Sequence, residues 1–151
     1  MKDTTERPTG ESVAATGEPA GDMFVLLEAA RNLQGRLDAA LESAGLSAAK
    51  YAALEKLARS GKPLTLGELA GCLQCARSNI TQLVDRLEAE GLVERVDDEH
   101  DRRAIRARVT ALGVERFTTA EWAIRGVQSE LEARVPVEER SLFRRVLSSL
   151  R

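Results

Sequence analysis

Cysteine, histidine and aromatic residues are scarce in this sequence of 151 residues. Two cysteines cannot build the disulfide framework of a small secreted domain, and one histidine leaves few metal ligands. Aromatic residues make up 3% of the chain, too few for a platform that stacks single-stranded nucleic acid. Apolar runs are only a few residues long, which excludes a transmembrane helix. These absences favour an ordinary globular protein with a cytoplasmic location.

The charge pattern excludes a globally basic nucleic-acid coat. The formal net charge is −2, from 22 basic and 24 acidic residues. Most of the basic residues are arginines, whose planar fork suits directed contacts to phosphates and base edges. A local basic surface therefore stays open even though the whole chain is weakly acidic.

The N-terminal residues 1–21 are predicted to form a disordered tail. Proline, glycine and small polar residues alternate there without an apolar period, and the apolar segment of a secretory signal is missing. Order is expected to begin at Asp22, a favourable N-cap residue.

Apolar residues recur at helical spacing in the first half of the chain. The predicted helices cover residues 22–44, 47–60, 65–73 and 76–90. Thr65 and Glu68 have the spacing of a capping box at the start of the third helix. The first, second and fourth helices each end at a glycine, as helices often do.

The apolar period then changes from 3.6 to 2 residues, which is typical of strands. Residues 92–96 and 105–109 are predicted strands, and the polar turn 97–103 joins them into a hairpin with a charged tip. A fifth helix is expected after Thr110 and a sixth from Pro136, since proline is favoured at a helix start.

These elements define a fold class that is mainly α with a small two- or three-stranded β-wing. Residues 63–110 form a winged helix-turn-helix lobe. Residues 22–62 and 111–151 form a helical dimerisation region, because the first and sixth helices carry more apolar residues than one small lobe needs.

The start of the fourth predicted helix carries polar side chains suited to reading duplex DNA. They all bear hydrogen-bonding groups, and none is a bulky apolar residue: Arg77, Ser78, Asn79, Thr81 and Gln82. The major groove of B-DNA admits one α-helix, whose first turns meet the base edges. A solvated helix face explains the same pattern taken alone, because amphipathic helices have polar faces. The hairpin that follows favours the DNA-binding interpretation.

The hairpin supplies four arginines within seven residues: Arg102, Arg103, Arg106 and Arg108. An arginine at the tip of a wing can enter the narrow, electronegative minor groove beside a major-groove site. The alternative is a salt-bridged turn, because several carboxylates lie adjacent. Both interpretations hold together if Asp101 orients Arg103.

The stretch from Leu64 to Gly113 resembles the MarR family of bacterial transcriptional regulators. The wing sequence DRRAIRARVT followed by Gly113 matches the family's Asp-x-Arg, hydrophobic strand, Leu-Thr and x-x-Gly ending. The sequence LVDRLEAEGLVER matches the end of the family's recognition helix and its exit strand. By position and length of the helices, the resemblance extends over a MarR-like domain of residues 22–151.

The resemblance implies a homodimer in which the first, fifth and sixth helices interlock. It implies two recognition helices one helical turn apart on a pseudo-palindromic operator. The recognition role maps onto the polar residues of 77–82, and the wing role maps onto Asp101 and Arg103, with Arg102 beside them. Family members are often released from DNA by small phenolic or lipophilic ligands, metals or oxidants. Such a ligand is expected between the dimer helices and the DNA-binding lobe. Its candidate lining residues are aromatic, and ordinary core packing is the favoured interpretation for each of them: Phe24, Tyr51, Phe117, Trp122 and Phe143.

One departure from the family concerns the cap of the recognition helix. Ala76 stands where the family usually has a serine, and this loses a capping hydrogen bond of about 1 kcal/mol. Cys75 or the backbone would have to compensate.

Cys72 and Cys75 have Cys-x-x-Cys spacing. A zinc site would need further ligands, and the single histidine, His100, lies far along the chain in the wing. A redox switch stays open, since a disulfide or sulfenate at the helix-turn-helix bend would move the recognition helix. The favoured interpretation is that both cysteines are small buried fillers, with Cys75 in a core position, because free cysteine behaves as a small hydrophobe.

We therefore predict a sequence-specific DNA-binding transcriptional regulator. It is expected to be a repressor that acts as a homodimer and is released by a small aromatic or lipophilic effector or by an oxidant. The alternatives are a redox-sensing regulator switched through Cys72 and Cys75, and a winged-helix adaptor that docks another protein. Phosphate-binding, nucleophile-elbow and metal motifs are missing, so we expect no enzymatic activity and no cofactor. The expected partners are double-stranded DNA and a second copy, without a membrane.

Overall fold

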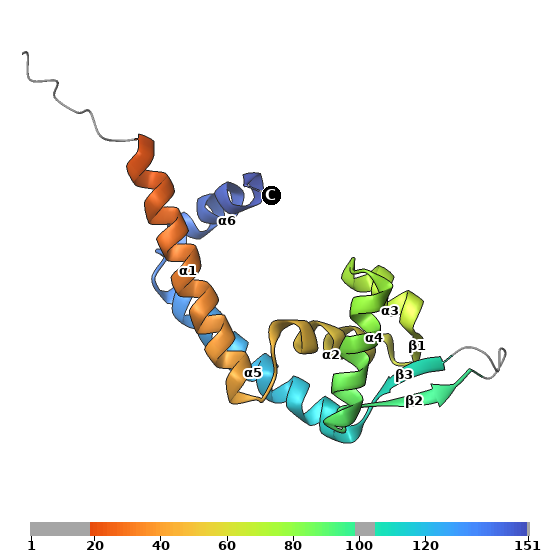
Figure 1. Cartoon of the computed structure of the whole chain (residues 1–151). Helices are drawn as coiled ribbons and strands as arrows, with labels where there is room; N and C mark the ends of the chain where they lie inside the picture. Colours follow the sequence, from red (N-terminus) through yellow and green to blue (C-terminus); the bar gives the residue numbers. More distant parts are fainter. Residues whose placement is uncertain (1–18, 99–104, 151) are drawn as a thin grey trace, which may run out of the picture. The chain divides into compact units, whose positions relative to one another are not determined.

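The computed structural model describes residues 19–98 and 105–150, which form helices and one small sheet (Figure 1). The elements follow in the order α1 (Pro19–Ser43), α2 (Ala48–Ser60), β1 (Leu64–Thr65), α3 (Leu66–Leu73), α4 (Arg77–Ala89), β2 (Val93–Asp97), β3 (Ile105–Val109), α5 (Ala111–Ala133), the 3-10 helix η1 (Val137–Glu139) and α6 (Arg140–Ser149). This arrangement confirms the predicted fold class, mainly α with a three-stranded wing.

Two helix starts differ from the sequence predictions. Order in the described residues begins at Pro19, because proline fits the first helical position, so the predicted tail is three residues too long. Asp22 lies in the first turn of α1 and is not its N-cap. Pro136 caps the short η1, and the sixth α-helix begins only at Arg140. The rest of the tail prediction, residues 1–18, lies outside the described residues.

The sheet has the antiparallel order β1-β3-β2. In the predicted hairpin, Val93 pairs with Val109 and Asp97 with Ile105. The third strand, β1, consists of two residues, with Leu64 opposite Ala107. A two-residue strand has no apolar period of its own, so only its pairing with β3 identifies it.

The core lies under the winged helix-turn-helix. Fully buried leucines from α2, α3 and α4, namely Leu54, Leu69 and Leu87, pack with the sheet residue Ala107. Phe117 of α5 joins them, and its ring stacks on that of Tyr51 at a centroid distance of 5.5 Å. This core holds α3, α4 and the sheet in fixed positions.

At Gly113 the start of α5 lies directly against the backbone of Leu92, the residue before β2. A Cβ atom at position 113 would lie 2.1 Å from the carbonyl oxygen of Leu92, which real Cβ atoms do not tolerate. The Thr110 backbone N–H donates to the same Leu92 oxygen at 3.1 Å, and the Thr110 hydroxyl caps α5 at the Gly113 N–H. Only glycine allows this close approach.

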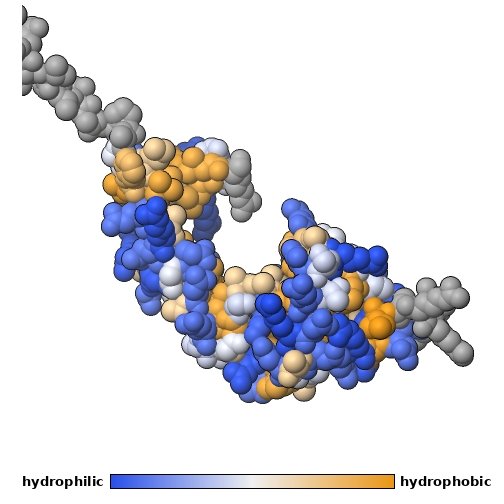
Figure 2. All heavy atoms as spheres, in the orientation of Figure 1, coloured by the Kyte–Doolittle hydropathy of each residue, from blue (hydrophilic) through white to orange (hydrophobic). Residues whose placement is uncertain are grey.

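The chain divides into two units at Leu33, and the first unit contains the N-terminal part of α1. Its described side chains from Gly21 onward are exposed. In the second unit, α6 is also exposed from Ser141 to Ser149, and hydrophobic residues gather over it in Figure 2. None of the described helices combines the length and apolar content needed to cross a bilayer.

Candidate nucleic-acid interface

The helix-turn-helix is built by local signals in the sequence. At the start of α3, Thr65 and Glu68 form the predicted capping box, with the Glu68 N–H donating to the Thr65 hydroxyl at 3.1 Å and the Thr65 N–H donating to the Glu68 carboxylate at 2.7 Å. The Thr65 N–H lowers the pKa of Glu68 below its usual 4.5 because it bonds the ionised form. The two residues thus confirm the expected start of α3.

The turn between α3 and α4 consists of three residues, 74–76. Gln74 adopts a left-handed conformation with φ 51°. The Cys75 N–H then donates to the Ala70 carbonyl at 3.1 Å, the bond of a Schellman motif. Ala76 follows as the N-cap of α4 and makes no side-chain cap, as the sequence predicted. Cys75 does not compensate at that cap, because its thiol donates to the Leu73 carbonyl at 3.2 Å.

The structure exposes the predicted recognition residues on α4. Ile80, Val84 and Leu87 are buried on one face of the helix. The side chains of Arg77, Ser78, Asn79, Thr81 and Gln82 are all exposed. Figure 2 shows mainly hydrophilic residues over this helix.

Arg77 and Thr81 differ from the other exposed residues of this set in what they contact. The guanidinium of Arg77 lies over Gly67, where a Cβ atom added to the glycine would lie 3.2 Å from its Nη2 atom. The Thr81 hydroxyl donates to the Arg77 carbonyl at 3.1 Å, within the helix. Both side chains are therefore already engaged with neighbouring groups of the helix-turn-helix.

The base of the wing is fastened to α3 by Arg106. Its guanidinium pairs with the buried Asp98, with Glu68 at 3.2 Å and with the Pro63 carbonyl at 3.2 Å. The capping-box carboxylate of Glu68 thus has a second role that the sequence did not indicate. The two residues are 38 positions apart, so only the fold brings them together.

The arginines of β3 are paired with carboxylates. Arg106 bonds Asp98, and Arg108 pairs across the sheet with Glu94 at 2.8 Å. Arg95 of β2 donates to both Asp85 and Glu88 of α4, and its hydrogen bond to Asp85 raises the arginine pKa. For these strand residues the salt-bridge interpretation holds, and the pairs connect the wing with α3 and α4.

The tip of the wing falls outside the described residues. This concerns the predictions for Asp101, Arg102, Arg103 and His100. What the structure does place is the base of the hairpin, next to α4 (Figure 1).

Both cysteines are exposed, so their prediction as buried fillers is wrong. The inward face of α3 is taken by Leu69 and Ala70, which leaves Cys72 on the outside. Cys75 lies in the turn and not in the core position that its place in the sequence suggested. The two thiols are therefore open to solvent reagents.

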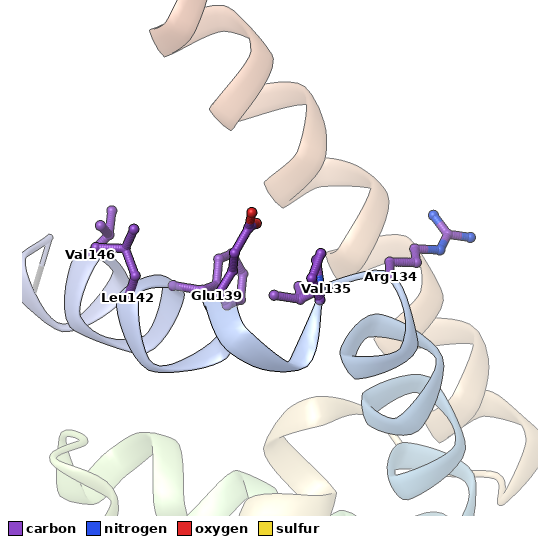
Figure 3. Close-up of a pocket in the computed structure, with 7 residues that line it drawn as sticks. Arg134, Val135, Glu139, Leu142 and Val146 are labelled. Carbon is purple, nitrogen blue, oxygen red and sulfur yellow. The ribbon is translucent and has the colours of Figure 1, made fainter.

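The aromatic residues predicted to line an effector pocket lie in different places among the described residues. Tyr51 and Phe117 pack in the core, whereas Phe24 and Trp122 are exposed. Phe143 borders a hollow of about 320 Å³ where α5 ends and α6 begins. Figure 3 shows this hollow, with Leu142 and Val146 one helical turn apart on α6.

The arrangement of α3, turn, α4 and hairpin defines a winged helix-turn-helix protein. Residues 44–104 match the model of the MarR family. Over 92 residues the chain is 35% identical to the "Transcriptional activatory protein BadR" of Rhodopseudomonas palustris, and the match covers 60% of this chain and 53% of BadR. Over 103 residues it is 31% identical to the "HTH-type transcriptional regulator PrsX" of Escherichia coli, with 66% of this chain and 62% of PrsX covered.

Solved structures share the fold. YusO of Bacillus subtilis superposes with a TM-score of 0.75 at 23% identity, covering 90% of this chain and 96% of YusO. A MepR variant of S. aureus, solved bound to an oligodeoxyribonucleotide, superposes with a TM-score of 0.66 at 21% identity, covering 86% and 98%. The chain is thus similar to MarR-family regulators over residues 44–104, and it shares its fold with these solved structures. The chain spans about half to three fifths of the length of BadR and PrsX.

Proposed function

We propose that this protein is a transcriptional regulator that binds specific sites in duplex DNA through α4 and the wing. The observation that carries the proposal is the exposed polar surface on the first two turns of α4, held by a buried core and by paired arginines at the wing base. An α-helix with this surface fits the major groove. The MepR variant solved with an oligodeoxyribonucleotide supports the same use of the fold.

The wing tip takes the second contact in this proposal. Arg103, with Arg102 beside it and Asp101 to orient it, enters the minor groove next to the major-groove site. The arginines of β3 are engaged with carboxylates, so the tip arginines carry the charge for this contact. Removing Arg103 is expected to weaken binding by about 1–3 kcal/mol.

The regulator acts as a homodimer in this proposal. Residues 22–62 and 111–151 supply the dimerisation region, and α6 leaves an apolar stripe uncovered in the single chain. A twofold partner is the commonest way to bury such a stripe and would set two α4 helices on a pseudo-palindromic operator. Light scattering is expected to report a dimer, and Leu142→Asp is expected to shift it toward monomer.

In this proposal the protein represses its target genes, and a small aromatic or lipophilic effector relieves the repression. A related fold supports this, since an organohalide-sensing RdhR regulator was solved in its 2,4-dichlorophenol-bound form. BadR is named an activatory protein, so a reporter gene behind the operator decides the direction of control. Reporter output that rises on deletion of the regulator indicates repression, and output that falls indicates activation.

Fluorescence anisotropy with genomic fragments tests the proposal directly. Wild-type protein is expected to bind its operator with an affinity that falls steeply between about 50 and 200 mM salt. The double variant Asn79→Ala and Arg103→Ala is expected to lose operator binding. The matched control Gln128→Ala changes an exposed residue of α5 and, once light scattering shows the same oligomeric state as wild type, is expected to bind normally. Binding that is insensitive to salt and to the double variant would instead support the protein-adaptor alternative.

A redox-sensing regulator is the second candidate, and the exposure of both thiols favours it. Cys72 lies on the outer face of α3, and Cys75 immediately precedes the N-cap of α4. Two-electron oxidation by a peroxide would join the sulfurs, with the peroxide reduced to water and an alcohol. Peroxide is expected to abolish DNA binding and dithiothreitol to restore it. If Cys75→Ser protein responds to peroxide as wild type does, this candidate is rejected.

A further inference from the structure

The predicted recognition residues differ in the direction in which their side chains leave the axis of α4. An α-helix turns by about 100° per residue, so the buried Ile80, Val84 and Leu87 fix the inward direction of the helix. Gln82 leaves the axis within about 15° of the opposite, outward direction, and Ser78 within about 25°. These two residues are one turn apart and form the ridge that first meets a groove.

The other polar residues lie on the flanks of this ridge. Asn79 and Thr81 diverge from the outward direction by roughly 75–85° in opposite senses, and Arg77 by about 125°. The contacts agree with this geometry, because the Arg77 guanidinium lies over Gly67 and the Thr81 hydroxyl bonds the helix backbone. Flanking residues suit contacts to the phosphates that line the groove.

Beyond Gln82, the residue on the outward line is Ala89, and the exposed Arg86 diverges from that line by about 55°. Ala89 has no hydrogen-bonding side chain. The carboxylate of Asp85 is bonded by Arg95 of β2, which holds it toward the sheet. Gln82 is therefore the longest side chain on the outward ridge that can donate and accept hydrogen bonds at once.

We propose that Gln82 reads an adenine in each half of the operator, with Ser78 supporting it at the neighbouring base pair. The glutamine amide pairs with adenine by accepting from its N6 amino group and donating to its N7 atom in the major groove. The serine hydroxyl fits several bases and adds little discrimination. This inference rests on the proposed function, since it names the base that the same helix recognises.

Selection of bound duplexes from a randomised library, followed by affinity measurement, tests the inference. Wild-type protein is expected to select adenine at one position of each half-site, and replacing it by guanine is expected to weaken binding about 5- to 150-fold. Gln82→Ala is expected to abolish the preference at that position alone. Gln82→Glu is expected to move the preference to cytosine, because a carboxylate accepts from the cytosine N4 amino group.

Two controls make the outcomes distinct. Gln128→Glu places the same change on the exposed surface of α5 and, once light scattering shows the same oligomeric state as wild type, is expected to leave the selected sequence unchanged. Circular dichroism checks that each Gln82 variant is folded. If the Gln82 variants select the same bases as wild type, the inference is overturned while the proposed function stands. If wild-type protein selects no sequence and shows no salt-dependent duplex binding, both fail.

Discussion

The winged helix-turn-helix and α6 bury their apolar residues to very different degrees. In the first, Leu54, Leu69 and Leu87 are 0% exposed. In α6 and its C-cap, which have an equally regular apolar stripe, Leu142 is 52% and Leu150 is 61% exposed. The core of the winged helix-turn-helix is thus complete within one chain, whereas the apolar stripe of α6 stays exposed in it. The buried core that positions α3, α4 and the sheet therefore does not include the surface proposed for dimerisation.

The largest expected effect comes from truncating the core of the lobe. Leu87→Ala removes a fully buried side chain and is expected to cost about 2–5 kcal/mol of unfolding free energy, because a cavity is left. Leu147→Ala on α6 removes the same atoms from a side chain that is 43% exposed and is expected to cost far less. Urea unfolding at a protein concentration where both variants are monomeric compares them. Equal losses would break the contrast between the two regions.

A second contrast uses two glycines of α5. Gly113→Ala is expected to destabilise the protein by about 1–3 kcal/mol or more, since its Cβ would press on the Leu92 carbonyl. Gly126→Ala meets no neighbouring atom within 4 Å and is expected to stabilise the helix by up to about 1 kcal/mol. Thermal unfolding by circular dichroism measures both. The close approach at Gly113 is wrong if the two substitutions shift the melting temperature in the same direction.

Helix caps provide a smaller test within the helix-turn-helix. Thr65→Ala breaks the capping box of α3 and is expected to cost about 1 kcal/mol. Ala76→Ser adds a hydroxyl at the uncapped start of α4 and is expected to add about 0.5–1 kcal/mol. Urea unfolding checks both signs. A neutral Ala76→Ser variant would show that the backbone around α4 already satisfies its first amides.

The smallest expected effect is a pH dependence from Glu68. Its pKa is lowered from 4.5 by the Thr65 N–H, so the ionised carboxylate stabilises the fold. This contribution is present above pH 4.5 and is lost as the pH falls through the lowered value. Wild-type protein is therefore expected to lose more stability than Glu68→Gln as the medium is acidified. Glu115→Gln, at an exposed position of α5, serves as the control for removing one charge. Parallel pH curves for wild type and Glu68→Gln would contradict the prediction.

The elements with local signals were the predictable ones. The capping box at Thr65, the glycine that ends α2 and the strand of residues 105–109 all appear where the sequence places them. The prediction that the cysteines are buried was wrong. It relied on the usual burial of free cysteine, whereas Leu69 and Ala70 fill the core side of this short α3. The sequence pattern of α4 indicated its polar face, but the roles proposed for Ser78 and Gln82 needed the buried face as a reference.

By itself, the sequence determined the order of the helices, the hairpin and the polar start of α4, because capping, turn formation and amphipathic spacing act over a few residues. The tertiary structure alone decided that Arg106 joins the wing to Glu68 of α3 and that Arg95 of β2 pairs with Asp85 of α4. It also decided that Gly113 must lie against Leu92. Such contacts join residues far apart in the chain, and they exist only after the core has brought the helices and the sheet together.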